Sequence, residues 1–258
     1  MARIPIGLQL YSVRHELEKD VRGTLEAVAE MGYEGVEFAG PPQQGAEELK
    51  GILADVGLVC CGWHTPFNLV QDDGLDETIA FNKALGNRFV IVPGIPAELR
   101  SSRDDWLKMA EFFNSLAQRL AAHDMVTGYH NHHVEFSPLD GEPPWDTFFG
   151  NTKKDVVMQI DLGNALYGGG DLVSILERYP GRAVTVHLKP YSKEAGRDDP
   201  RLGFRPLIGE DDVPWDDIFR LCETVGGTEW YIVEYESDAF PPLEAVDRCL
   251  KALKAMGK

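Results

Sequence analysis

Polar and ionisable side chains recur in this sequence at the ends of short apolar runs that are otherwise typical of buried strands. In chain order they are Glu37, His64, His130, His132, His133, Glu135, Asp161, Asn164, His187, Lys189, Glu234 and Glu236. A strand of a parallel sheet is buried on both faces and its sequence is almost continuously apolar, so the presence of polar residues at the strand ends requires an explanation. Since the carboxyl ends of parallel barrel strands meet at one face, we expect these side chains to converge there.

A divalent cation would explain that convergence. An unpaired buried ionisable group carries a desolvation cost of several kcal/mol, whereas a cation gives such groups a common partner. Asp161, His187 and Glu234 end three consecutive apolar runs, which favours one shared site. The mixed nitrogen and oxygen donors suit Mn²⁺, Co²⁺, Fe²⁺, Zn²⁺ or Mg²⁺ and do not choose among them. We take Mn²⁺ as the first expectation.

Each of these residues also has a purely structural interpretation. A single His or Asp at a strand end is commonly a hydrogen-bonded cap of the next turn. His123 is expected at the end of a helix, as a favourable C-terminal cation. Trp63, beside His64, could stack on a sugar ring or support the barrel as a buried aromatic residue, and the sequence leaves both open.

The intervening sequence predicts the elements that would position these residues. Short β-branched runs alternate with longer amphipathic stretches, which is typical of βαβ units and a parallel sheet. Strands are expected at 4–10, 35–38, 58–63, 89–92, 126–130, 156–161, 183–188 and 231–234. Helices are expected at 21–31, 46–55, 78–85, 104–123, 145–149, 172–179, 215–225 and 243–256. This alternation predicts one (β/α)8 TIM barrel domain covering 1–258.

The connections between these elements add two expectations. Glycines in MGYEGVE, DVGLV and TVGGTEW should end three helices, because a residue that tolerates positive φ is needed there. Longer connections at 132–144 and 189–214 follow the fifth and seventh strands, on the face where such barrels build their sites.

Composition restricts the classes of function. With 258 residues, 43% hydrophobic and 26% charged, the chain is typical of a globular protein with a sizeable core. Its formal net charge of −17 repels phosphate backbones and anionic membranes, so we expect neither nucleic acid nor membrane partners. The N-terminus lacks the apolar core of a signal peptide, and no window reaches the ~18 apolar residues that span a bilayer, so we expect a cytoplasmic protein. Cys60 and Cys61 would point to opposite faces of a strand, which disfavours a disulfide framework.

In order and spacing, the motifs resemble the sugar isomerase/epimerase superfamily of xylose isomerase-like barrels. The similarity covers GLQLYSVR, GYEGVEFAG, GYHNHHVEF, QIDLGNA with GGGD, VHLK, PLIGEDDVPW and WYIVEYE. It implies one divalent metal at the mouth of the barrel and a small sugar or polyol substrate. The YHNH form looks like the subgroup that contains inosose dehydratase-like and 3-keto-glycoside-acting proteins.

The resemblance also implies a ligand set. In ketose epimerases of this superfamily a Glu, an Asp, a His and a second Glu hold the metal. The matching positions here are His130, Asp161, His187 and Glu234, so the first ligand departs from the pattern. The departure leaves a single obvious carboxylate base, which argues against exchange of a proton on both faces of a substrate. Glu135 could supply the missing carboxylate if its loop folds back.

The mechanism that this resemblance implies begins with a metal that polarises the carbonyl of a ketose, keto-sugar or cyclic polyol. Glu234 is the expected base for the neighbouring proton, and Lys189, His132 and His64 would stabilise or reprotonate oxygen. The remaining expected site residues are Glu135 as a second catalytic carboxylate and Arg14, Trp63, Asn164 and Glu37 as substrate contacts.

Several outcomes are compatible with that first step. An isomerase or epimerase is the leading prediction, because that is the broad activity of the superfamily, and a dehydratase or other lyase is the second. A phosphodiesterase like endonuclease IV needs several metals and a basic rim, which this acidic chain does not offer. A non-catalytic partner subunit and a homo-oligomer stay open.

Overall fold

Strands β1 to β8 form a closed parallel barrel in chain order, with β8 paired to β1. The computed structural model describes residues 3–41 and 43–258. Within them the strands are β1 (Ile6–Gln9), β2 (Gly35–Ala39), β3 (Val59–His64), β4 (Phe89–Val92), β5 (Val126–His130), β6 (Val157–Asp161), β7 (Thr185–Leu188) and β8 (Trp230–Val233). The predicted (β/α)8 barrel is confirmed.

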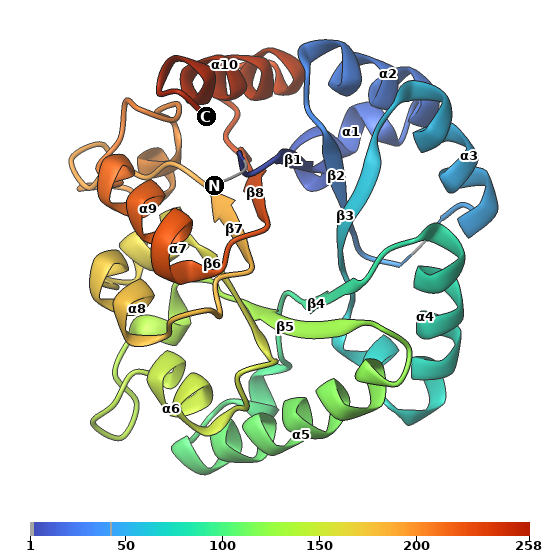
Figure 1. The fold of residues 1–258 in the computed structure, drawn as a ribbon. Helices are drawn as coiled ribbons and strands as arrows, with labels where there is room; N and C mark the ends of the chain where they lie inside the picture. The colour runs from blue at the N-terminus through green and yellow to red at the C-terminus, as the bar shows by residue number, and fades with distance from the viewer. Residues whose placement is uncertain (1–2, 42) are drawn as a thin grey trace.

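The helices surround this barrel as an outer ring (Figure 1). The longer ones are α2 (Val21–Met31), α3 (Ala46–Val56), α4 (Asp72–Leu85), α5 (Arg103–Ala121), α6 (Pro144–Asn151) and α10 (Pro242–Ala255). The shorter ones are α1 (Arg14–Leu17), α7 (Leu162–Tyr167), α8 (Leu172–Arg178) and α9 (Trp215–Leu221), with a π-helical turn, η6 (Cys222–Gly226), after α9. Single 3-10 turns occur at η1 (Leu10–Val13), η2 (Phe67–Val70), η3 (Ala97–Leu99), η4 (Val134–Phe136) and η5 (Pro200–Phe204).

Local sequence signals account for several helix ends. The predicted glycine stops are confirmed, because Gly32 and Gly57 follow α2 and α3 with φ of 97° and 80°. At the start of α5, the Ser102 side chain accepts from the backbone N–H of Asp105, whose carboxylate accepts from the backbone N–H of Ser102. This reciprocal cap fixes the first turn of the longest helix.

Helices α4 and α7 differ from the expectation, and α1 was not expected either. Helix α4 begins at Asp72 rather than at 78, because Asp72 and Asp73 favour the positive end of the helix dipole. Helix α7 was not expected and starts directly after β6, where the Asp161 carboxylate accepts from the backbone N–H of Asn164 as its N-cap.

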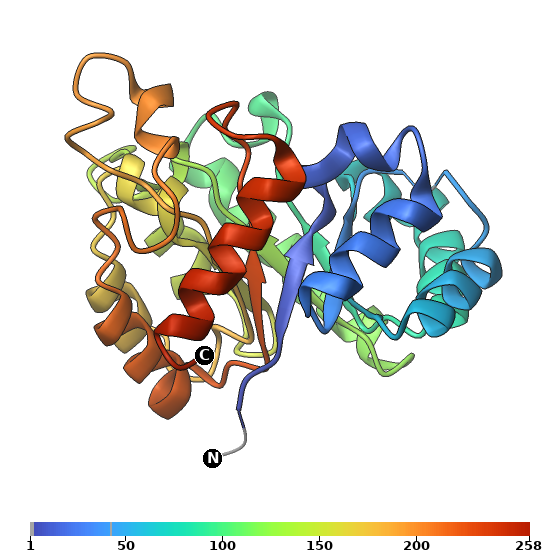
Figure 2. The same ribbon diagram turned by 90° about the horizontal axis from the view of Figure 1, so that it is seen from above.

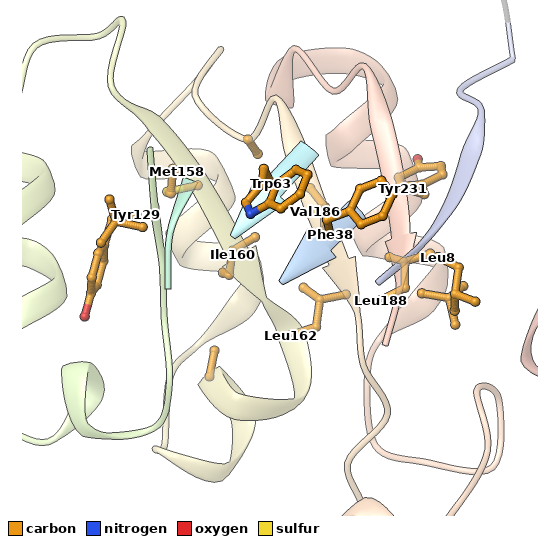
Figure 3. Packing of buried hydrophobic residues seen from close by; sticks show 14 of the residues in the cluster. Leu8, Phe38, Trp63, Tyr129, Met158, Ile160, Leu162, Val186, Leu188 and Tyr231 are labelled. Carbon is orange, nitrogen blue, oxygen red and sulfur yellow. The ribbon is translucent and has the colours of Figure 1, made fainter. Parts of the chain in front are cut away.

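The apolar core lies mainly between the barrel and its helices. Figure 3 shows Trp63 against Phe38, and their rings stack with centroids 4.8 Å apart. Inside the barrel, a small separate cluster of Phe89, Ile91 and Val157 lies toward the amino ends of the strands. The carboxyl half of the interior is therefore left to polar side chains.

The connection at 189–214, which contains η5, rises above the carboxyl ends of the strands (Figure 2). It forms one wall of the barrel mouth, as its position after the seventh strand predicted. All four cysteines are free thiols, in line with the expected lack of a disulfide framework. Within the described residues, no helix has both the length and the apolarity that a bilayer crossing requires.

Candidate functional site

Four side chains from four consecutive strand ends meet inside the mouth of the barrel. They are His130 at the end of β5, Asp161 at the end of β6, His187 in β7 and Glu234 just after β8. One donor atom from each lies within 4.8 Å of the other three, and all four residues are buried. The structure thus groups the residues expected to be metal ligands, and it does so with donor types that suit a divalent ion.

His187 lies between two carboxylates. Its Nδ1 donates to Oε2 of Glu234 at 2.8 Å, and its Nε2 donates to Oε2 of Glu37 at 2.6 Å. Burial alone would lower the pKa of His187, but Glu37 and Glu234 raise it to about 10. Without a metal the ring is therefore an imidazolium that offers no free lone pair.

Asp161 is oriented by Asn164. Its Oδ1 accepts from the backbone N–H of Asn164 at 2.7 Å, and its Oδ2 accepts from the side-chain amide at 3.0 Å. Oδ2 also faces His130 Nε2 at 3.8 Å and Lys189 Nζ at 3.7 Å. Burial raises the pKa of Asp161 to about 7, and Glu234 adds to this while Lys189 opposes it.

Lys189 links this cluster to the cavity above it. Its Nζ donates to Glu236 at 2.8 Å and lies 3.6 Å from Oε2 of Glu234. Burial would lower the pKa of Lys189, but Glu234, Asp161 and Glu236 together raise it. For Glu234, burial would raise the pKa, but Lys189 and the hydrogen bond from His187 hold it well below its ordinary value.

The charges of this connected group do not balance. Four carboxylates, those of Glu37, Asp161, Glu234 and Glu236, face only two cations, those of His187 and Lys189. Burial, together with Glu234, also raises the pKa of Glu236 to about 7. When all four carboxylates are ionised, the buried group carries two negative charges in excess, and a divalent cation would offset them. The residues present therefore fit a divalent metal.

A cavity of about 410 Å³ opens above the cluster, within the usual range for small-ligand sites. Among its walls are the following residues predicted for the site: His64, His130, His132, Asn164, Lys189 and Glu234. Glu236 lines it too, and so does Tyr11, which is 44% exposed. Asn164, Lys189 and Glu236 also line an adjoining cavity of about 610 Å³ under the 189–214 connection.

Glu135 lies elsewhere than expected. Its Oε1 accepts from the Tyr129 hydroxyl at 2.6 Å, and its Oε2 accepts from the backbone N–H of His132 at 2.9 Å. Tyr129 packs outward, against Trp106 of α5, so these bonds turn the carboxylate away from the four-residue cluster in the barrel mouth. Of the two residues considered for the fourth ligand position, the structure therefore brings His130, and not Glu135, together with Asp161, His187 and Glu234.

Three expected substrate contacts are not at the cavity wall. Trp63 is 4% exposed, stacks on Phe38 and donates from its indole N–H to the carbonyl of Gly40, so it supports the barrel from outside. Arg14 lines a neighbouring cavity of about 210 Å³, where its guanidinium lies 4.3 Å from the centre of the Tyr11 ring. Glu37 is fully buried beside His187, one layer deeper in the barrel.

Gln159 and Gln9 were not among the residues expected at the site. Gln159 is fully buried, and its Oε1 lies 2.6 Å from His64 Nε2 and 3.1 Å from His130 Nδ1. Gln9 donates to Glu37 at 2.8 Å. Both lie within apolar runs that are typical of buried strands. A polar amide in such a run was the sequence feature that could have indicated a role in the site.

Comparisons with known proteins agree with the barrel fold. The sequence pattern of a family described as xylose isomerase-like TIM barrel matches residues 25–256. An inosose dehydratase from Erwinia tasmaniensis is 28% identical over 252 residues, which cover 86% of this chain and 84% of that protein. A crystal structure described as a sugar phosphate isomerase/epimerase from Parabacteroides distasonis is 25% identical, with a TM-score of 0.81 over 99% of this chain and 95% of that one.

A third likeness bears on the fold alone. The structure of a probable 3-DHS dehydratase from Bacillus anthracis superposes with a TM-score of 0.74 at 15% identity, over 97% of this chain and 99% of that one. The family match covers most of the residues and includes the strands that carry the cluster. This chain belongs to the xylose isomerase-like TIM barrel family.

Proposed function

We propose that this chain is a metal-dependent dehydratase, which removes a proton next to the carbonyl of a keto-sugar or of a cyclic polyol ketone and then expels a neighbouring oxygen as water. The observation that carries this proposal is the placement of carboxylates around the cavity. Glu234 and Glu236 both come from the segment after β8, whereas Glu135 is bound to Tyr129. A base is therefore available from one side of the substrate. The inosose dehydratase relative supports the same reaction class.

The four clustered side chains would hold the cation, with Mn²⁺ as the first candidate. Such an ion, when bound, supplies Lewis-acid polarisation of the substrate carbonyl. Glu234 is in the ionised form that a base requires, since Lys189 keeps its pKa low. Its carboxylate takes the proton from the carbon beside the carbonyl, and the electron pair of that C–H bond forms the new carbon–carbon double bond.

The second half of the reaction needs an acid and a stabiliser of negative charge. His132 lines the cavity, where desolvation lowers its pKa, so its imidazolium form is a stronger acid than a free imidazolium and can protonate the oxygen that leaves as water when its C–O bond breaks. Lys189 keeps its proton because its carboxylate neighbours raise its pKa. It therefore acts as a fixed positive charge beside the developing oxyanion.

Isomerisation or epimerisation is the second candidate. It shares the proton abstraction by Glu234 and differs only in where the proton returns. The likeness to the sugar phosphate isomerase/epimerase from Parabacteroides distasonis favours it. Epimerisation requires a proton donor on the opposite face of the substrate, and the outward position of Glu135 leaves that role to His132 or His64.

Incubation of Mn²⁺-loaded protein in D₂O with an inosose and a panel of free ketoses distinguishes the two candidates. After removal of metal and protein, proton NMR and ultraviolet absorbance follow the substrate. Loss of the proton beside the carbonyl together with appearance of an enone supports the dehydratase. Deuterium incorporation without loss of oxygen contradicts it and establishes the isomerase or epimerase.

The adjacent residues His132 and His133 give a matched pair of variants. Both side chains are exposed, but only His132 lines the cavity, whereas the His133 ring lies 4.5 Å from that of Tyr167. We expect His132→Gln to slow elimination by about 100-fold or more, the scale of a lost general acid. His133→Gln should leave the rate unchanged. Equal rates for the two variants would remove His132 from the mechanism.

A further inference from the structure

We propose that Glu37 and Gln159 are positioning residues, which decide the ring nitrogen that His187 and His130 present to the metal. The inference rests on the metal-dependent function proposed above and adds a second layer of residues to it. Both side chains are fully buried and lie deeper in the barrel than the four-residue cluster. Neither lines the cavity of about 410 Å³, so their action on the reaction is through the histidines.

When one ring nitrogen of His187 binds a metal, the hydrogen bond at that nitrogen is lost, either to Glu234 or to Glu37. Glu234 bonds to Nδ1 and is itself a member of the cluster, so it is free to turn to the ion. Glu37 bonds to Nε2 and is held on both oxygens, by Gln9 at 2.8 Å and by Gln159 at 2.9 Å. The ring of His187 therefore keeps its Nε2 proton on Glu37 and presents Nδ1 to the metal.

Gln159 determines the tautomer of His130, and there the nitrogen left for the metal is Nε2 rather than Nδ1. Its Nε2 donates to Glu37 and to the Thr185 hydroxyl, each at 2.9 Å, and a carboxylate such as Glu37 can only accept. The amide orientation is thereby fixed, and its Oε1 is the end that faces His130 Nδ1 at 3.1 Å. Nδ1 must then carry the proton. Nε2 of His130, which faces Asp161 at 3.8 Å, is left unprotonated and able to bind a metal.

The two histidines thus differ in the group that accepts a hydrogen bond from the ring nitrogen facing away from the metal. His187 is backed by a carboxylate, which makes its imidazole a more basic ligand and adds a negative charge near the ion. His130 is backed by a neutral amide, which orients its ring without adding charge. We therefore expect Glu37 to contribute more to metal affinity than Gln159 does.

The test uses Zn²⁺ as the probe and compares wild-type protein with Glu37→Gln and Thr185→Val. Glu37→Gln preserves shape and an oxygen that can accept from His187, but it removes the charge. Thr185→Val is the matched control, because Thr185 bonds to the same amide of Gln159 but belongs to neither the cluster nor the cavity wall. Competition with a chelating dye gives each dissociation constant, and circular dichroism confirms folding.

We expect Glu37→Gln to weaken Zn²⁺ binding about 10–100-fold and Thr185→Val to leave it unchanged. Equal affinity in wild type and Glu37→Gln overturns the role of Glu37, and so does an equal loss in both variants, which would indicate general disruption of the interior. Wild-type protein that binds no Zn²⁺ would overturn the proposed metal-dependent function as well.

Nitrogen NMR of isotope-labelled histidine in Zn²⁺-loaded wild-type protein tests the assignment without any variant. We expect the remaining ring proton on Nε2 of His187 and on Nδ1 of His130. A proton on Nδ1 of His187, or on Nε2 of His130, would overturn the corresponding assignment.

Discussion

Replacing Asp161 with Asn should stabilise the metal-free protein while it destroys the metal site. Asp161 is fully buried in a group where four carboxylates face two cations. Burial raises its pKa from 3.8 to about 7, and at about 1.4 kcal/mol per pKa unit the difference corresponds to about 4 kcal/mol. The variant keeps an oxygen to accept from the backbone N–H of Asn164, so the cap of α7 is preserved.

The sign of the effect follows from the raised pKa. The folded state holds the Asp161 proton more tightly than the unfolded state, so ionisation lowers stability as the pH rises from about 4 to about 7. Above pH 7 the full penalty is present, and below about pH 4 it vanishes. Asp161→Asn should therefore be more stable than wild type by up to about 4 kcal/mol at about pH 8, and the difference should shrink in acid.

Urea unfolding with and without a divalent metal measures both halves of this prediction. In the presence of a chelator the variant should have the higher free energy of unfolding. Added metal at about 100 times its dissociation constant should stabilise wild type by about 2.7 kcal/mol and the variant not at all. A variant that is less stable than wild type in chelator at about pH 8 would show that Lys189 already compensates Asp161, and would refute the charge-excess reasoning.

Three further predictions concern neighbouring residues. Because Glu37 and Glu234 raise the pKa of His187 to about 10, a bound ion must displace a proton, so apparent Zn²⁺ affinity should rise by up to about tenfold per pH unit between about pH 6 and 9. Calorimetry in buffers of different ionisation enthalpy should detect the released proton, and its absence would contradict the imidazolium. Tyr129→Phe removes a donor from the buried Glu135 and should lower the free energy of unfolding by about 1–3 kcal/mol, with metal affinity unchanged; a loss of metal would place Glu135 in the site after all. Trp63→Leu should cost about 2–4 kcal/mol of stability in urea but leave turnover per folded molecule intact, whereas lost turnover with normal stability would restore Trp63 as a substrate contact.

The strands and the grouping of the four buried polar residues were predictable because their signals are periodic and local. Each strand reads as a short apolar run, and parallel strands must bring their carboxyl ends together, so Asp161, His187 and Glu234 could be grouped from order alone. The start of α4 was harder, because Gly74 suggests a loop while the preceding aspartates favour a helix N-terminus.

The direction of individual side chains was not predictable to the same degree. Glu135 lies near the histidines in the sequence, but the Tyr129 hydroxyl and a backbone N–H hold it on the outer side of β5. Trp63 precedes His64 in the same strand, and the alternation of faces sends one to the helices and the other into the barrel. The role of Gln159 depends on contacts with Glu37 and Thr185, which lie far away in the sequence.

Metal content after reloading bears most directly on the four-residue cluster. Purified protein that is stripped with chelator, incubated with Mn²⁺ and passed through a desalting column should retain one ion per chain. The Asp161→Ala/His187→Ala double variant, with circular dichroism matching that of wild type, should retain none. Absence of bound metal in the wild-type protein, or full retention by the folded double variant, would contradict the assignment of this cluster as the metal centre.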